Sequence, residues 1–387
     1  MIKDLILLGS TGSIGTSTLS VIRKNKANFK IKLLTTNKNV NKILSQAIEF
    51  NVKKVVVFDK NKFERFKNKF KKKRIKVFFT VNEALKNSRR KKAFFTISAI
   101  SGIEGLEPTL QVIKFTKNLG IANKESIICG WKLLKKELTN QNCNFIPLDS
   151  EHFSIWTLMD GENKNNIKKI YLTASGGPFL KNKLNDIKNI SPSKALMHPN
   201  WKMGKKISID SATMMNKVFE VIETQRIFDL PKSKIHILIH EKSYVHAIVQ
   251  FKNGLNKILA HDTSMKIPIF NTIYDNKKFI KTKDLDIRNL NNLNLKIIDK
   301  KKFPLIEILK FIPETNSLFE TLLVSANDEL VNLFLDKKIS YINFQKRLKN
   351  FIKLKEFRKL RRKKPKNIKE IYALNEYVRL KIKSLCI

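Results

Sequence analysis

Cysteine, glycine and acidic residues are all scarce in this chain of 387 residues. The three cysteines are Cys129, Cys143 and Cys386, an odd number without a CxxC pair. They predict neither a disulfide framework nor a zinc site, and a reducing compartment suits them best.

Long hydrophobic runs are also missing. No apolar run approaches the roughly 18–20 residues that cross a bilayer, and Asp4 interrupts the N-terminal stretch MIKDLILLGSTG, so no signal peptide is expected. We therefore expect a cytoplasmic protein that does not bind membranes. With 42% hydrophobic and 28% charged residues, the chain has a globular composition, and its length allows two or three domains.

The shortage of acid leaves a formal net charge of +44, from 77 Lys and Arg against 33 Asp and Glu. Such a charge is typical of nucleic-acid-binding proteins, and that class stays open until binding to DNA is titrated with salt. However, only 12 of the 77 cations are Arg, lysine is spread along the whole chain, and no nucleic-acid motif is present. We interpret the lysines as solvated surface positions and expect no specific nucleic-acid partner, although a positive field would attract anionic substrates.

Short apolar runs alternate with helical patterns up to about residue 149. Strands are expected at 4–9, 30–36, 53–59, 76–80 and 93–100, with helices at 13–26 and 39–50. This alternation predicts an α/β fold with a parallel sheet. We therefore assign residues 1–149 to one Rossmann-like domain.

The pattern changes after residue 150. Residues 168–179 read as a strand entering a Gly-Gly-Pro turn, 210–228 as a helix opened by Asp210 and Ser211, and 234–251 as a pair of strands. This predicts an α+β domain over 150–275, a linker over 276–302 rich in Asn, Lys and Asp, and a small helical C-terminal domain over 303–387.

A glycine-rich segment, Gly9-Ser-Thr-Gly-Ser-Ile-Gly15, follows the first strand and precedes the first helix. We call residues 9–15 the phosphate loop, because glycines in this context let backbone N–H groups approach a pyrophosphate. NAD sites usually carry an acid at the end of the second strand to bind the ribose hydroxyl. Here that strand ends in Thr-Thr-Asn37-Lys38-Asn39, so NADPH is favoured over NADH.

Three further segments carry candidate chemistry. Asp149 and Glu151 would share one face of an extended segment and suit Mg²⁺ or Mn²⁺, since hard cations prefer oxygen ligands. The turn around Ser175 and the helix start at Ser211 offer hydroxyls to an anion, where Ser211 would cap the helix or bind the anion. Segment 198–204, HPNWKMG, is expected to be either a lid or a loop packed on the core.

The chain resembles the 1-deoxy-D-xylulose 5-phosphate reductoisomerase family. The motifs GSTGSIGTSTL, GIANKES, PLDSEH, LTASGGPF, HPNWKMGKKISIDSATMMNK, VHAIVQFKNG and VSANDELVNLFL occur in the family's order along essentially the whole chain. The resemblance implies conversion of 1-deoxy-D-xylulose 5-phosphate and NADPH into 2-C-methyl-D-erythritol 4-phosphate, the committed step of the non-mevalonate isoprenoid route. It implies a cation-assisted retro-aldol and aldol rearrangement followed by hydride transfer, in a homodimer with a flexible lid.

The same resemblance implies the site residues. Asp149, Glu151 and Glu220 would ligate the divalent cation, and with Lys124 and His198 they form the catalytic set. The substrate would contact Lys124, Ser150, Glu151, Ser175, His198, Trp201, Met203, Ser211, Asn216, Lys217 and Glu220. Among these, the phosphate would be bound by Ser175, Ser211, Asn216 and Lys217, and the lid would contain His198, Trp201 and Met203. The resemblance also implies that residues 1–149 form the NADPH-binding domain and residues 150–275 the catalytic, metal-binding and dimerisation domain. The cofactor would contact Thr11, Gly12, Ser13, Ile14, Asn37, Lys38, Asn39, Asn123, Glu125, Gly204 and Met265.

The chain departs from the family pattern at a few positions. Asn37 stands where glycine is more common, His240-Glu241-Lys242-Ser243 replaces His-Pro-Gln-Ser, and Asp262-Thr263-Ser264 precedes Met265. We assign His236 and His240 no catalytic role. Another NADP-linked enzyme, such as a semialdehyde dehydrogenase, would need a nucleophilic cysteine near a histidine, and no cysteine here has that setting.

Overall fold

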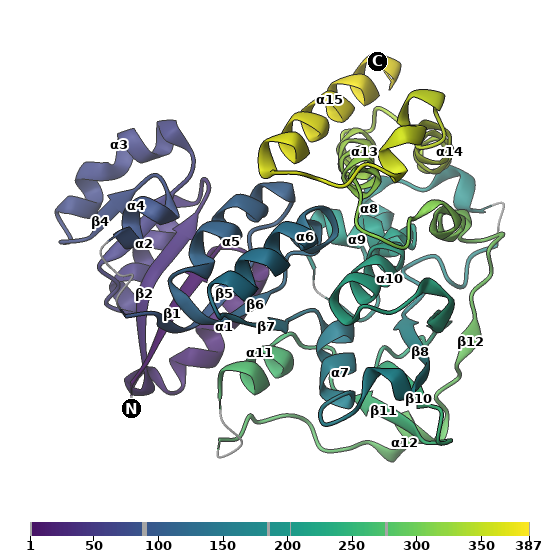
Figure 1. The fold of residues 1–387 in the computed structure, drawn as a ribbon, viewed down its shortest axis with the longest axis horizontal. Helices are drawn as coiled ribbons and strands as arrows, with labels where there is room; N and C mark the ends of the chain where they lie inside the picture. The colour runs from purple at the N-terminus through teal and green to yellow at the C-terminus, as the bar shows by residue number, and fades with distance from the viewer. Residues whose placement is uncertain (1, 87–90, 184–185, 202, 275–277, 387) are drawn as a thin grey trace. The chain divides into compact units, whose positions relative to one another are not determined.

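The computed structural model describes residues 2–86, 91–183, 186–201, 203–274 and 278–386. The chain forms two compact units (Figure 1). The first contains Met1–Ile127, Lys132–Asp149 and Met265–Lys281; the second contains Ile128–Trp131, Ser150–Ser264 and Thr282–Ile387. The structure thus differs from the predicted division, because residues 265–281 belong to the first unit and the C-terminal helices share the second unit with residues 150–264.

The first unit is built on a seven-stranded parallel sheet with the order β4-β3-β2-β1-β5-β6-β7. Its strands are β1 (Lys3–Leu8), β2 (Phe29–Thr36), β3 (Lys54–Val57), β4 (Lys76–Phe78), β5 (Ala93–Ser98), β6 (Thr116–Ile121) and β7 (Asn144–Pro147). Its helices are α1 (Ser13–Arg23), α2 (Val40–Glu49), α3 (Lys60–Lys71), α4 (Val81–Leu85), α5 (Leu106–Ile113), α6 (Lys124–Asn140) and α11 (Lys266–Ile273), with short 3₁₀ turns at Lys26–Asn28 and Ile103–Gly105. The predicted α/β class is confirmed, and the strand order reverses between β1 and β5, where doubly wound sheets bind ligands.

Helix α11 joins the first unit because its apolar side chains pack into the same core as the sheet. Ile269, Phe270 and Ile273 are buried there. The Tyr274 ring stacks on Phe270 at 4.5 Å between centroids and meets Phe29 edge-on at 5.1 Å. Tyr274 follows Phe29 by 245 residues (274 − 29), so local sequence pattern could not reveal this contact.

The second unit contains a mixed sheet with the order β11-β10-β8-β9-β12. Its strands are β8 (Ile167–Ala174), β9 (Ile235–Ile239), β10 (Val245–Phe251), β11 (Asn256–Ala260) and β12 (Lys296–Ile297). Strands β9 and β10 correspond to the predicted pair, but they lie on opposite sides of β8, parallel and antiparallel to it respectively. The predicted linker supplies the edge strand β12.

Helices make up the rest of the second unit, and the predicted helical C-terminus is confirmed. They are α7 (Ser150–Leu158), α8 (Pro192–Ala195), α9 (Lys205–Ala212), α10 (Met215–Phe228), α12 (Ile287–Asn291), α13 (Leu318–Leu335), α14 (Tyr341–Phe351) and α15 (Ile368–Cys386). Further 3₁₀ turns lie at Lys164–Asn166, Asp186–Asn189, Lys232–Lys234, Pro304–Phe311 and Lys355–Arg361. Within the described part of the chain, no helix has the length and apolar character that crossing a membrane requires.

The helix predicted over 210–228 is in fact two helices. Met214 has a φ of 65°, a left-handed conformation that ends α9 and starts α10. Ser211 therefore lies in the last turn of α9, and the prediction that it caps a helix starting there is wrong. Met214 occupies the N-cap position of α10 instead.

Candidate active site

The phosphate loop has the geometry of a pyrophosphate site. Gly9 has a φ of 79°, and a Cβ there would lie 2.6 Å from the Ala99 carbonyl oxygen; a Cβ on Gly15 would lie 2.3 Å from the Gly9 oxygen. Both positions therefore require glycine. Helix α1 begins at Ser13 without a side-chain cap or an acid in its first turn. No side chain there would therefore compete with a bound anion for the N–H groups of the helix.

The end of β2 holds the phosphate loop in place. The Gly9 N–H donates to Thr35 Oγ1 at 2.8 Å, and the Thr11 and Thr36 hydroxyls are 2.8 Å apart. Beyond them, Asn37, Lys38 and Asn39 are exposed and carry no acid. These residues fit a dinucleotide with a 2′-phosphate.

The remaining predicted cofactor residues lie at three helix starts. Asn123 caps α6, its Oδ1 accepting from the Ser126 N–H at 2.6 Å and its Nδ2 donating to Glu125 at 3.2 Å. Met265 occupies the N-cap position of α11 in the first unit, whereas Gly204 occupies the N-cap position of α9 in the second.

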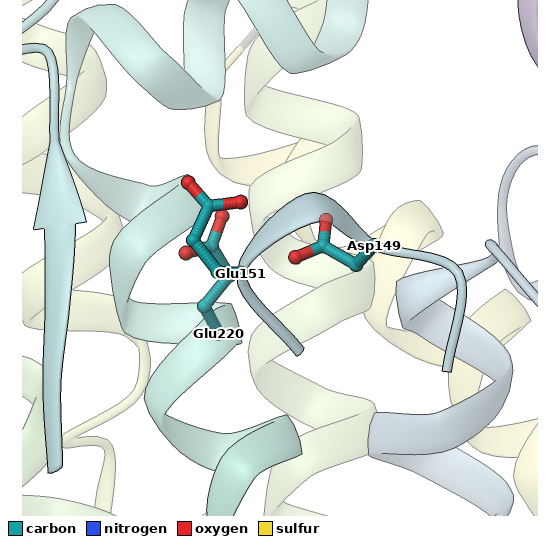
Figure 2. A group of neighbouring side chains, drawn as sticks. All are labelled: Asp149, Glu151 and Glu220. Atoms are coloured by element: carbon teal, nitrogen blue, oxygen red, sulfur yellow. The ribbon is translucent and has the colours of Figure 1, made fainter. Parts of the chain in front are cut away.

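Three carboxylates form the centre of the site. Oxygen atoms of Asp149, Glu151 and Glu220 lie within 4.8 Å of one another, and Figure 2 shows the three side chains converging. Ser150 and Glu151 begin helix α7, so the prediction of an extended Asp-Ser-Glu segment is wrong. The grouping arises because Asp149 directly precedes α7 and because α7 packs against α10, which carries Glu220.

Two lysines compensate these carboxylates. The Lys124 ammonium is paired with Asp149. Lys217 Nζ donates to Glu151 Oε1 at 2.9 Å and to the Thr173 carbonyl at 2.6 Å, and it forms an ion pair with Glu220 Oε2 at 2.5 Å. Burial would lower the pKa of Lys217, but the two glutamates outweigh burial and raise it. Among the described residues, each of the three carboxylates therefore has an ammonium partner.

A divalent cation fits this group of side chains. All three acids offer oxygen ligands, the set preferred by Mg²⁺ and Mn²⁺. Asn216 Nδ2 donates to Glu220 at 2.6 Å, and the side-chain oxygen Oδ1 of Asn216 is buried without a hydrogen-bond partner. The site therefore combines three carboxylate ligands with an unsatisfied acceptor.

The predicted anion-binding hydroxyls lie around the turn that follows β8. Ser175 Oγ accepts from the Gly177 N–H at 3.1 Å and from His198 Nε2 at 3.0 Å, which leaves its own proton free for a ligand. A Cβ on Gly177, whose φ is 65°, would lie 2.9 Å from the Ser211 carbonyl oxygen, so this turn packs closely on α9. The fold thus brings Ser175 and Ser211 into one region, while Lys217 is engaged by the carboxylates.

His198 is held as a neutral imidazole. Its Nδ1 accepts from the Asn200 and Trp201 N–H groups at 3.2 and 3.0 Å, which places the proton on Nε2. Burial lowers the pKa of His198 to about 4, and the Lys217 ammonium acts in the same direction.

This low pKa predicts an acid-sensitive stability. An unfolded histidine titrates near pH 6.5, so between pH 6.5 and about 4 the unfolded chain binds the proton that folded His198 does not. The contribution is fully present above pH 6.5 and is lost as the pH falls through this window. We expect His198→Gln to reduce the loss of unfolding free energy between pH 6.5 and 4 by about 1–2 kcal/mol after solvent screening. The measured result is a shallower decline of Tm with falling pH. A decline identical to that of the wild type would contradict the assignment.

Residues 198–201 contact a pair of stacked histidines that the sequence did not single out. The Trp201 ring is half-buried and meets His246 edge-on, with ring centroids 6.0 Å apart, and His246 stacks on His261 at 3.8 Å. Asn200 Nδ2 donates to the Glu241 carbonyl at 2.6 Å, so the unusual segment 240–243 holds Asn200 in place. Met203 is also half-buried.

Sequence reasoning also missed His152, a buried residue of α7 that contacts α10. Its Nε2 contacts the Glu220 carbonyl oxygen at 3.0 Å and Thr224 Oγ1 at 3.1 Å, linking α7 to α10. The available signal was its position next to Glu151 in PLDSEH.

Comparisons with known proteins agree on one family. The models that match are the 1-deoxy-D-xylulose 5-phosphate reductoisomerase model at residues 5–130, its C-terminal domain model at 145–228, and the DXP reductoisomerase C-terminal domain model at 261–381. The enzyme of that name from Pelagibacter ubique is 54% identical over all of both chains, and that from Clostridium tetani is 36% identical over 98% of this chain and 99% of its own.

Solved structures of the same enzyme share the fold. The Zymomonas mobilis enzyme in complex with NADPH has a TM-score of 0.86 and 29% identity, covering 100% of this chain and 99% of its own. A second structure, in complex with NADPH, fosmidomycin and magnesium, has a TM-score of 0.91 and 29% identity, covering 99% and 98%.

The fold and the site define an NADPH-dependent oxidoreductase with a divalent-cation centre. The chain belongs to the 1-deoxy-D-xylulose 5-phosphate reductoisomerase family. The family assignment made from the sequence motifs is confirmed, as are the enzyme class and its two cofactors.

Proposed function

We propose that this protein converts 1-deoxy-D-xylulose 5-phosphate into 2-C-methyl-D-erythritol 4-phosphate with NADPH and Mg²⁺ or Mn²⁺. The observation that carries the proposal is the convergence of Asp149, Glu151 and Glu220 beside the Ser175 turn. A bound cation would supply Lewis-acid stabilisation of the oxygen charge that develops in the rearrangement.

The chain's own side chains divide the remaining work. Asp149, Glu151 and Glu220 would hold the cation. Lys124, paired with Asp149, and Ser150, whose hydroxyl contacts Glu151, would bind the substrate oxygens near it. Asn216 and Lys217 contact Glu220 and would complete the set of side chains that bind the substrate next to the cation.

The substrate phosphate would bind at the Ser175 turn. Ser175 offers a hydroxyl proton, and Ser211 lies across the turn from it. His198, fixed as the Nε2–H tautomer, orients Ser175 and would donate toward the phosphate as Ser175 moves. Trp201 and Met203 would close over the substrate and exclude water.

NADPH oxidation tests the function directly. We expect absorbance loss at the NADPH band only when 1-deoxy-D-xylulose 5-phosphate and Mg²⁺ or Mn²⁺ are both present, with product confirmed by mass spectrometry. Cation-independent oxidation, or oxidation without the rearranged product, would refute the proposal.

Replacement of Trp201 separates a lid from a core residue. Trp201→Ala should lower kcat/KM for the substrate by about 100-fold, because misplacing a bound substrate has effects of this size, while Tm changes little since the ring is half-buried. Trp201→Phe is the matched control that keeps an aromatic lid. A loss of roughly 3–5 kcal/mol in unfolding free energy would contradict the lid role and indicate that Trp201 is a core residue.

We also propose that the protein is a cytoplasmic homodimer, as the family resemblance implies. Sedimentation equilibrium at several concentrations, run with and without the substrate analogue fosmidomycin, gives the assembly state. A monomer at all concentrations would reject the dimer without affecting the proposed reaction.

A further inference from the structure

Two side chains of helix α2, one turn apart, form hydrogen bonds with the phosphate loop. Lys42 Nζ donates to the Thr11 carbonyl oxygen at 2.9 Å. Gln46 is buried and makes a reciprocal pair with Ser10, its Nε2 donating to the Ser10 carbonyl at 3.0 Å and its Oε1 accepting from the Ser10 hydroxyl at 2.8 Å. Residues i and i+4 share a helix face, so one face of α2 fixes two successive residues of the loop.

The positive charge of Lys42 is unfavourable at its position in helix α2. Asn39 caps α2, accepting from the Lys42 N–H at 3.2 Å, so Lys42 lies in the first turn, which contains no acid. The N-terminus of a helix carries partial positive charge and favours anions over cations. An exposed ammonium at this position becomes favourable when an anion binds next to it.

The position of that ammonium is also the place where dinucleotide sites select their cofactor. In this fold the end of β2 and the start of the next helix face the adenine ribose. The loop of exposed residues Asn37, Lys38 and Asn39 occupies this place without an acid. Lys42 lies on the same helix start, and its contact with Thr11 restrains it against the phosphate loop, so less side-chain entropy is lost when it binds a ligand.

We propose that Lys42 determines the preference for NADPH over NADH, by binding the 2′-phosphate with an ammonium that the Thr11 carbonyl holds in position. The inference rests on the proposed function only in its use of NADPH. Lys38 adds a second cation at the same end of the cofactor.

A purely structural role for Lys42 makes a different prediction. If the ammonium only tethered the phosphate loop, removing it would weaken every adenine dinucleotide equally, because the loop contacts the pyrophosphate that all of them share. A charge contact with the 2′-phosphate affects only ligands that carry this group. The ratio between matched ligands therefore distinguishes the two roles.

Isothermal titration calorimetry on the full-length protein, without substrate, tests the proposal. The ligand pairs are NADPH with NADH, and adenosine 2′,5′-bisphosphate with adenosine 5′-monophosphate. We expect Lys42→Met to raise the Kd of the two 2′-phosphorylated ligands about tenfold or more, as for loss of one charge-assisted hydrogen bond. The Kd values of NADH and the monophosphate should stay within about twofold, and the difference should shrink with added salt.

Matched variants complete the test. Lys42→Arg should retain NADPH affinity, whereas Lys30→Met, which removes an exposed charge at the opposite end of β2, should change neither ligand pair. The Tm of unliganded Lys42→Met should not fall, since Lys42 is exposed; Lys42→Gln serves as a second neutral variant. Equal losses for both members of a pair, or no loss, would overturn the role of Lys42. A wild type that binds neither NADPH nor the bisphosphate would instead overturn the proposed function.

Discussion

Asp149→Asn should lower turnover by a factor on the order of 10³. The amide removes one of three anionic ligands, and cation stabilisation of developing charge contributes several kcal/mol to the transition state, each 1.36 kcal/mol being tenfold in rate. NADPH affinity should stay within about twofold, because the phosphate loop lies elsewhere in the first unit. Steady-state assays with varied Mn²⁺ and a calorimetric NADPH titration measure the two quantities.

The control for Asp149→Asn is Asp160→Asn, which removes an exposed acid just beyond α7 and should leave turnover unchanged. Excess Mn²⁺ should recover part of the lost activity if the remaining two carboxylates still bind the cation. Wild-type turnover and Mn²⁺ dependence in Asp149→Asn would remove Asp149 from the cation site.

Lys217→Met should produce the largest loss of stability of any single replacement at the site. The ammonium is buried between Glu151 and Glu220, and removing one partner of a buried ion pair costs about 3–5 kcal/mol, because the carboxylates are left uncompensated. Chemical denaturation in the presence of EDTA measures the loss. Lys168→Met, an exposed replacement at the start of β8, should have little effect.

A divalent cation should reverse part of this loss. With Lys217 replaced, the cation becomes the remaining positive charge between the two glutamates, so Mn²⁺ should raise Tm more in Lys217→Met than in the wild type. An unchanged unfolding free energy in EDTA, or no extra stabilisation by Mn²⁺, would contradict the view that Lys217 and the cation compensate the same carboxylates.

The sequence alone was sufficient where function depends on neighbours in the chain. A phosphate loop between a strand and a helix, and the acid-free end of β2, are local patterns whose backbone requirements can be read directly from glycine spacing and charge. The family motifs contain the proposed metal ligands for the same reason. Asp149 and Glu151 are separated by a single residue, and Asn216 and Glu220 share a helix face at spacing i, i+4.

Tertiary structure decided everything that depends on distant segments or on a single backbone angle. Left-handed Met214 splits one helical pattern into α9 and α10 and so moves Ser211 from a helix start to a helix end. The apolar residues of α11 bury against a core whose other members lie more than 100 residues earlier in the chain. Lys217 gains its partners, Glu151 and Thr173, only when α7, β8 and α10 pack together. Periodicity specifies which face of an element is buried, but the partner across that face is selected by packing and charge compensation in three dimensions, which no local pattern encodes.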